Sequence, residues 1–141
     1  MSVVLKFGGT SVGTFDAVSR TMEIIASRLS EHPVVCVSAL SKVTDLLYEI
    51  ADAAAGGDSA SLESRMYELR SRHLKLVRSL LSADPDGCDR ASARVNGICD
   101  TLAAVVSSVT ALGDVPDRIR AVIISHGELL SSTIICYALN S

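Results

Sequence analysis

The stretch Val3-Val4-Leu5-Lys6-Phe7-Gly8-Gly9-Thr10-Ser11-Val12-Gly13 decides the fold. Its first five residues form a short apolar run with one basic residue, which predicts a strand covered on both faces. The two glycines that follow allow a sharp turn with positive φ and let a ligand approach the backbone N–H groups. A helix is expected to begin near Thr14, and its N-terminus favours an anion. With Lys6 at the end of the strand, the stretch predicts a phosphate-handling loop, although a tight turn without a ligand fits equally well.

The length and composition predict one compact domain with a genuine apolar core, because 48% of the 141 residues are hydrophobic. The net charge of −3, the few aromatic residues and the absence of Trp argue against a nucleic-acid partner. The chain enters a strand without a charged leader, and no uninterrupted apolar run approaches about 18 residues. We therefore expect a soluble, cytoplasmic protein with neither a nucleic-acid nor a membrane partner.

The cysteines predict no structural metal site and no disulfide framework. They are widely spaced and include no CxxC pair. We expect reduced and mostly buried thiols at Cys36, Cys88, Cys99 and Cys136.

The residues after the glycines predict a helix and a second strand. Apolar residues recur at steps of three and four over 15–29, Thr14 is a suitable N-cap, and the helix is expected to run to His32. Val34 to Val37 then predicts a second buried strand. Together these elements predict a parallel, right-handed βαβ unit. Since ligands bind at the carboxyl ends of parallel strands, Lys6 should share one rim with the residues after the second strand.

A polar loop follows the second strand and leads into a helix. It extends from Ser38 to Asp45 and contains three hydroxyl side chains and a lysine. Ordinary loop and capping chemistry, with Ser41 or Thr44 as the N-cap, explains these residues better than ligand binding does when the loop is taken by itself. Gly56 and Gly57 are expected to close the helix.

Two helical segments with narrow apolar seams follow, and they predict an antiparallel hairpin over residues 60–113 with a solvated, charged outer face. The turn is expected at residues 84–87. His73 interrupts the first seam, and we expect a packed or partly exposed side chain there rather than a catalytic one. The seams comprise Leu62, Met66, Leu69, His73, Leu76 and Leu80, and then Ala91, Val95, Ile98, Leu102, Val105, Val109 and Leu112.

The last segment, residues 116–140, carries Ser125-His126-Gly127-Glu128-Leu129 inside an otherwise apolar helix. Burying such polar groups without partners is costly, so they are expected to face a site or a polar contact in the core. Gly127 predicts a bend or a new helix start that would direct Glu128 at a cavity. A pure packing role for Glu128 is the alternative.

Three of these segments together resemble the amino-terminal half of the catalytic domain of aspartokinases, which belong to the amino-acid-kinase family. They are Lys6-Phe7-Gly8-Gly9-Thr10-Ser11, residues 37–47 and Ser125-His126-Gly127-Glu128-Leu129. The resemblance runs the whole chain and implies the amino-terminal part of a three-layer α/β, carbamate-kinase-like fold that is mostly helical. The implied parts are a βαβ unit with the substrate loop (1–55), a helical hairpin (60–113) and a further helix (116–140). The later half of the domain and the regulatory ACT domains would be absent.

The resemblance implies aspartate kinase activity, the first step of lysine, threonine and methionine biosynthesis. The γ-phosphoryl group of ATP would pass to the side-chain carboxylate of L-aspartate and give 4-phospho-L-aspartate, with Mg²⁺ accompanying ATP. Lys6 would be the catalytic contact to the transferring phosphate oxygens. Gly8, Gly9, Thr10 and Ser11 would cradle the ATP phosphates with backbone and hydroxyl donors.

The same resemblance implies the aspartate side of the site. Ser38, Ala39 and Thr44 would line the substrate pocket, and Glu128 would bind the α-ammonium group through a charge-assisted hydrogen bond. No general base is implied, because a carboxylate nucleophile is already ionised near pH 7. No metal ligand in the chain is implied either. Many relatives carry smaller residues around Lys42, whose contribution stays open.

Two other interpretations fit the sequence. The first is another enzyme of the amino-acid-kinase fold that acts on a different carboxylate, a carbamate or a phosphate. The second is a non-catalytic helical module whose seams pair with another chain. We also expect self-association, and we expect the 141-residue chain alone to bind nucleotide weakly and to have no turnover.

Overall fold

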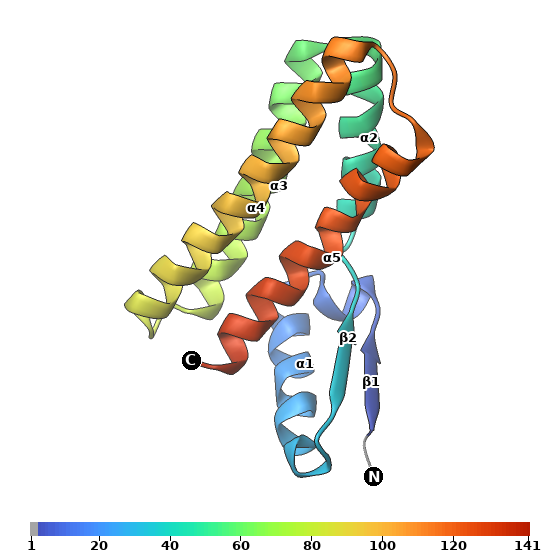
Figure 1. Cartoon of the computed structure of the whole chain (residues 1–141). Helices are drawn as coiled ribbons and strands as arrows, with labels where there is room; N and C mark the ends of the chain where they lie inside the picture. Colours follow the sequence, from blue (N-terminus) through green and yellow to red (C-terminus); the bar gives the residue numbers. More distant parts are fainter. Residues whose placement is uncertain (1–2) are drawn as a thin grey trace.

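The computed structural model describes residues 3–141, which form a small parallel sheet at one end and a group of long helices at the other (Figure 1). This mostly helical α/β arrangement confirms the predicted partial fold. Its elements in chain order are β1 (Val4–Phe7), η1 (Gly9–Val12), α1 (Phe15–Ser27), η2 (Leu29–Glu31), β2 (Val34–Val37), α2 (Val43–Gly56), α3 (Ser59–Leu80), α4 (Pro85–Leu112) and α5 (Asp117–Leu139).

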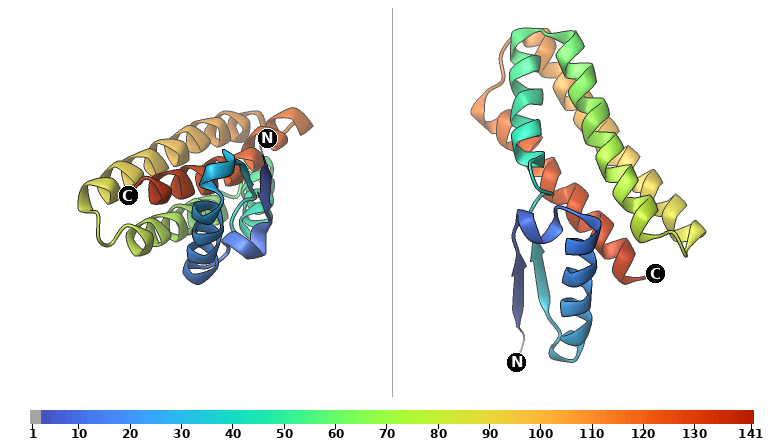
Figure 2. Two further views of the ribbon diagram at one scale, coloured as in Figure 1. Left: turned by 90° about the horizontal axis from the view of Figure 1, so that it is seen from below. Right: turned by 180° about the vertical axis from the view of Figure 1, so that it is seen from behind.

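The two strands form a parallel pair whose register runs from Val4 opposite Val34 to Phe7 opposite Val37. α1 runs alongside this sheet (Figure 2), and the half-buried residues of both strands pack toward the core. The other residues alternate with these and are exposed, with Val4 at 66% and Val34 at 54%. Within residues 3–141 the predicted burial of both sheet faces is therefore wrong.

The start of α1 was predicted correctly and its end was not. The Thr14 hydroxyl accepts a hydrogen bond from the Ala17 N–H at 3.2 Å, as an N-cap does. The helix ends at Ser27, short of the expected His32. A short 3₁₀ helix follows instead, and His32 takes a left-handed conformation with φ of 49°. The chain thus reverses toward β2 before Pro33 is reached.

The predicted helical hairpin is present as α3 and α4, joined by a short turn. Asp84 caps α4, since its side chain accepts a hydrogen bond from the Gly87 N–H at 2.9 Å. Arg70 links the two helices with bonds to Asn96 at 2.9 Å and to Asp100 at 2.6 Å. The seams differ in detail, because the buried residues of α3 are Leu69, His73 and Val77, and Leu112 at the end of α4 is 76% exposed.

α5 is one continuous helix from Asp117 to Leu139, so the predicted bend at Gly127 is wrong. Gly127 is required by packing instead. A Cβ atom there would lie 2.7 Å from the Cβ of Ala39. The glycine therefore allows α5 to approach the loop that follows β2.

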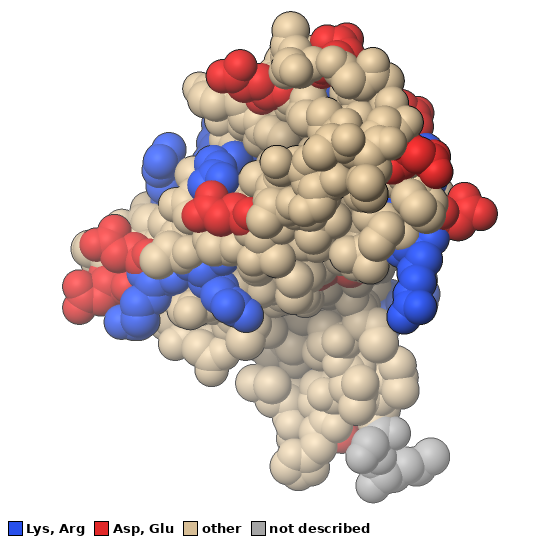
Figure 3. Space-filling model, turned by 45° about the horizontal axis from the view of Figure 1, so that its top comes forward, with Lys and Arg blue, Asp and Glu red and all other residues tan. Residues whose placement is uncertain are grey.

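α4 and α5 are each long and apolar enough to qualify as membrane-spanning helices. Core helices of globular folds share these properties, and α4 and α5 pack against each other and against α2. The face shown in Figure 3 carries acidic and basic side chains interspersed with uncharged ones.

The four cysteines are free, as expected, but the prediction that most are buried is wrong. Cys99 is buried and Cys88 is half-buried, whereas Cys36 and Cys136 are exposed. Cys36 alternates with half-buried neighbours along β2, so its exposure follows from the open face of the sheet.

Candidate functional site

The glycine stretch turns by a 3₁₀ helix rather than by positive φ. Gly8 is extended, with φ of −80° and ψ of 174°, and Gly9 is not among the residues with positive φ, so the predicted left-handed turn is wrong. The Ser11 N–H donates to the Gly8 carbonyl at 3.0 Å. The Thr21 hydroxyl of α1 donates to the Ser11 carbonyl at 2.8 Å. The loop is therefore anchored to the helix that follows it.

Of the residues expected to meet phosphate, Lys6 lies within β1, and the other four lie in the 3₁₀ turn or at its N-cap. Lys6, Gly8 and Thr10 are exposed, whereas Gly9 and Ser11 are half-buried. A Cβ atom on Gly8 would have nothing within 4 Å, so a ligand could reach the backbone there. A pocket of about 290 Å³ lies beside Thr10 and Ser11, and Arg20 of α1 lines it.

The loop after β2 meets the glycine stretch directly. The Ser38 N–H donates to the Phe7 carbonyl at 3.0 Å, which extends the strand pairing by one residue. A Cβ atom on Gly13 would lie 2.8 Å from the Ser41 Cβ. The two predicted loops therefore share one rim of the sheet, as the rule for parallel sheets requires.

α5 closes on the same loop from the other side. The Ser131 hydroxyl donates to the Ser38 carbonyl at 2.7 Å across 93 positions of sequence. One turn earlier, Gly127 packs against Ala39, which is buried. The structure thus brings together the three segments that the sequence singled out.

The predicted N-cap of α2 is wrong. Lys42 occupies the N-cap position, has no capping side-chain bond, and adopts a left-handed conformation with φ of 62° and ψ of 6°. Thr44 is half-buried in the first turn of the helix. The preceding carbonyl, that of Ser41, accepts a hydrogen bond from Arg72 of α3 at 2.8 Å.

Glu128 lies beside Gly127 on α5 but on an exposed part of the helix. Successive helical residues point about 100° apart, so Glu128 is not directed at Ala39 as Gly127 is. Its side chain makes no hydrogen bond or ion pair within residues 3–141. The carboxylate is therefore available to a ligand at the edge of the loop.

His73 is a packed side chain, as expected. It is fully buried, and its Nδ1 lies 2.6 Å from the Leu69 carbonyl oxygen. Nε2 has no partner among the described residues. Burial lowers the pKa of His73 to about 4; the Leu69 bond opposes this shift and the charge of Arg72 adds to it. The imidazole is therefore neutral at pH 7.

Three residues near the two loops were not predicted from the sequence: Arg72 and Ser131, which bond to the loop after β2, and Arg20, which lines the pocket beside Thr10 and Ser11. Arg72 belongs to the predicted charged outer face of the hairpin. The helical periodicity does not distinguish it from the other charged residues of that face. Ser131 lies two residues after the polar segment 125–129, and its position one helical turn after Gly127 was the available signal.

The whole chain matches the sequence model of the Amino acid kinase family, over residues 1–141. Aspartokinase from Chlamydia trachomatis is 35% identical over 138 residues, which cover 95% of this chain and 27% of that protein. The chloroplastic bifunctional aspartokinase/homoserine dehydrogenase 2 of Arabidopsis thaliana is 32% identical over 136 residues, covering 95% of this chain. The chain spans only 14% of the length of such bifunctional relatives.

Solved structures agree in fold. The chain superposes on E. coli aspartokinase III in complex with aspartate and ADP with a TM-score of 0.80 and 24% identity, over 99% of this chain and 29% of that one. A second structure of that enzyme, with lysine and aspartate, gives a TM-score of 0.81. From its sequence match and its fold, the chain belongs to the amino acid kinase family and corresponds to an amino-terminal portion of aspartokinases.

Proposed function

We propose that this chain supplies part of an aspartate kinase site, which transfers the γ-phosphoryl group of ATP to the side-chain carboxylate of L-aspartate. The observation that carries the proposal is the meeting of the three family-like segments on one rim of the sheet. The Ser38–Phe7 bond and the Ser131–Ser38 bond hold them together. The aspartokinase names of the relatives support aspartate as the acceptor.

On this proposal the phosphate side of the site is Lys6 with Gly8, Gly9, Thr10 and Ser11. The exposed lysine suits a phosphate as a compact point charge. The open space at Gly8 suits close approach of phosphate oxygens to backbone N–H groups. Phosphoryl transfer depends mainly on positioning and charge neutralisation, and these residue types serve both tasks.

The metal is proposed to arrive with the nucleotide. Residues 3–141 contain no group of three or more His, Cys, Asp or Glu side chains that could hold an ion. Mg²⁺ commonly keeps several waters and binds through substrate phosphates. In that role it would neutralise charge on the transferring group, while Lys6 orients the same oxygens.

The aspartate side is proposed to comprise Ser38, Ala39, Thr44 and Glu128. Ser38 and Ala39 contact α5, and Thr44 lies in the first turn of α2, so these residues lie where the loop meets two helices. The free carboxylate of Glu128 would bind the α-ammonium group of the substrate. The reacting carboxylate is ionised near pH 7, so it needs orientation rather than a general base.

The remaining parts of the proposal concern the chain as a unit. We infer that residues 1–141 alone bind nucleotide weakly without turnover, because the chain spans only 27% of the length of the Chlamydia trachomatis aspartokinase. The open sheet face, with Val4 and Val34 exposed, motivates self-association. A cytoplasmic setting is proposed as well, since the relatives include a bacterial aspartokinase beside chloroplastic enzymes.

A chimera tests the activity. Residues 1–141 would replace the matching segment of the Chlamydia trachomatis aspartokinase, and ADP release would be measured with Mg-ATP and aspartate. We expect activity with aspartate and little with glutamate, and no ADP release from the 141-residue chain alone. Preference for glutamate would overturn the acceptor assignment, and turnover by the chain alone would overturn the inferred inactivity.

Lys6→Ala separates a kinase site from a helical interaction module. We expect nucleotide binding by the chain to weaken at least about tenfold, since a phosphate contact by a charged group contributes about 1.5–3 kcal/mol. The matched control is Lys75→Ala, an exposed lysine of α3 outside the proposed site. Equal nucleotide affinities of the two variants, measured by calorimetry, would favour the module.

A further inference from the structure

We propose that Arg72 of the helical hairpin is a positioning residue, which fixes the orientation of one peptide group in the loop between β2 and α2. The role in substrate binding rests on the proposed function, because that function makes residues 38–44 the aspartate loop. The conformational role stands on the geometry of the loop itself.

The loop contains a tight turn at its most exposed point. The Val43 N–H donates to the Leu40 carbonyl at 2.9 Å, so Ser41 and Lys42 are the two central residues of a β-turn. Lys42 has φ of 62° and ψ of 6°, and Ser41 is not among the residues with positive φ. Only a type II turn combines a negative φ at the first central residue with a positive φ at the second.

A type II turn with lysine at this position is unfavourable by itself. Glycine or asparagine is preferred there, and a left-handed residue with a Cβ atom costs roughly 1–2 kcal/mol. A type I turn keeps the same closing hydrogen bond and avoids the strain. The two types differ mainly by a rotation of the central peptide through about 180°. Some other contact must therefore favour type II here.

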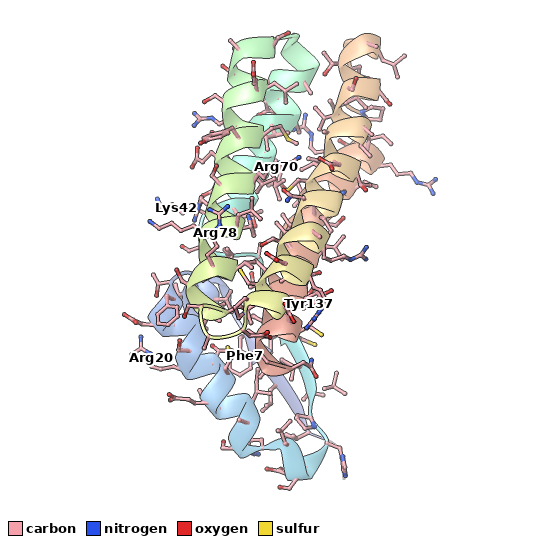
Figure 4. All side chains as sticks on the ribbon, turned by 90° about the vertical axis from the view of Figure 1, so that its left-hand side faces the viewer. Phe7, Arg20, Lys42, Arg70, Arg78 and Tyr137 are labelled. Atoms are coloured by element: carbon pink, nitrogen blue, oxygen red, sulfur yellow. The ribbon has the colours of Figure 1, made fainter. Side chains whose placement is uncertain are left out.

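Arg72 provides that contact. Its Nη2 donates to the Ser41 carbonyl at 2.8 Å, and this carbonyl belongs to the central peptide of the turn. Rotation to type I would turn the carbonyl away from α3 and break the bond. A hydrogen bond from a charged donor contributes about 1.5–3 kcal/mol, which is enough to offset the strain at Lys42. Figure 4 places Lys42 alongside α3, between the levels of Arg70 and Arg78.

The other contacts of the loop do not distinguish the two turns as directly. Ser131 holds the Ser38 carbonyl, before the turn, and Gly13 packs against the Ser41 side chain. Because the C=O and N–H of a trans peptide point in opposite directions, Arg72 also directs the Lys42 N–H away from α3. That N–H has no acceptor within residues 3–141. It is an oriented donor for an anionic substrate group.

Nuclear magnetic resonance on the 141-residue chain tests the conformational role. The nuclear Overhauser effect from the Ser41 Hα to the Lys42 N–H is strong in a type II turn and weak in a type I turn. We expect it to weaken in Arg72→Met, which keeps an apolar stem but removes the donors. It should recover in Arg72→Met/Lys42→Gly, because glycine removes the strain of type II. Arg78→Met, an exposed arginine on the same helix, is the matched control and should leave it unchanged.

The substrate role is tested in the chimera described above. Arg72→Met should raise KM for aspartate about tenfold and leave KM for ATP within about twofold, and Lys42→Gly in the same protein should reverse most of the increase. An unchanged Overhauser effect in Arg72→Met would overturn the inference. So would a loss of thermal stability on Arg72→Met that is equal with Lys42 and with Gly at position 42, if the Overhauser effect does not recover in the double variant. A chimera inactive with aspartate would instead overturn the proposed function, while the resonance result decides the role of Arg72.

Discussion

The sheet end and the helical end of the molecule differ in how completely they bury their own apolar residues. α2 contributes six buried residues, and α4 and α5 contribute eight each. β1 and β2 contribute none, because their residues alternate between exposed and half-buried. Yet both loops of the proposed site belong to the sheet end. The comparison teaches that the helical end supplies stability and also holds the site, through Arg72, Gly127 and Ser131.

The largest expected effect comes from a leucine of the helical end, and a leucine of the sheet end is its control. Leu102→Ala removes a fully buried side chain from α4 and should destabilise the protein by about 2–5 kcal/mol. Leu29→Ala makes the same chemical change at the sheet end, where Leu29 is 59% exposed, and should change stability by less than about 0.5 kcal/mol. Urea unfolding monitored by circular dichroism measures both. Similar losses would show that the two ends are equally packed.

Acidification should weaken the helical end through His73. The pKa of His73 is about 4 in the fold, below its ordinary value of 6.5, because the side chain is buried. The folded state favours the neutral imidazole. The contribution of His73 to the free energy of unfolding is therefore complete above pH 6.5 and declines as the pH falls toward 4. By pH 4 the free energy of unfolding should have fallen by about 3 kcal/mol.

His73→Leu supplies the control for that experiment, since leucine does not titrate. The free energy of unfolding of this variant should fall less between pH 6.5 and pH 4 than that of the wild type. Parallel pH profiles of the two proteins would contradict the assignment to His73.

A pair of glycines tests the contact between the two ends. Gly127→Ala places a Cβ atom 2.7 Å from the Ala39 Cβ, and overpacking of this kind costs about 1–3 kcal/mol. Gly97→Ala on α4 meets nothing within 4 Å and should stabilise the protein by about 0.5–1 kcal/mol through helix propensity. Thermal unfolding should therefore shift in opposite directions for the two variants. A gain in both would mean that α5 does not press against the loop.

A small effect is also expected at the turn before α2. Lys42→Gly removes a side chain from a left-handed position and should stabilise the chain by about 1 kcal/mol, reduced by the greater freedom of glycine when unfolded. Denaturant midpoints of the two proteins provide the measurement. A clear loss of stability would show that the lysine side chain makes a favourable contact there.

Local patterns predicted the elements well because the signals for helices and strands lie within a few residues. Thr14 as an N-cap and the two strands are of this kind. The exposure of Val4 could not be predicted, since an apolar strand residue looks the same whether or not a neighbour covers it. The straight path of α5 through Gly127 could not be predicted either, because the reason for the glycine is Ala39, far away in the sequence.

The candidate site divides in the same way. Its segments were recognisable as motifs, and the rule for parallel sheets placed two of them together. The contacts that set the loop geometry were not recognisable. Arg72 reaches Ser41 across 31 positions, and an arginine on a helix surface carries no mark of such a bond. The roles proposed for Lys6 and Glu128 stay predictions until nucleotide and aspartate binding are measured.

The bond between Ser131 and Ser38 also has a consequence in time. The two residues are 93 positions apart. Ribosomes add about 5–20 residues per second, so Ser38 is made roughly 5–20 s before its partner. Helices and hairpins form within microseconds, far faster than that interval. A newly made chain therefore has its glycine turn early, and its second loop gains the α5 contacts only when the last helix of this chain docks.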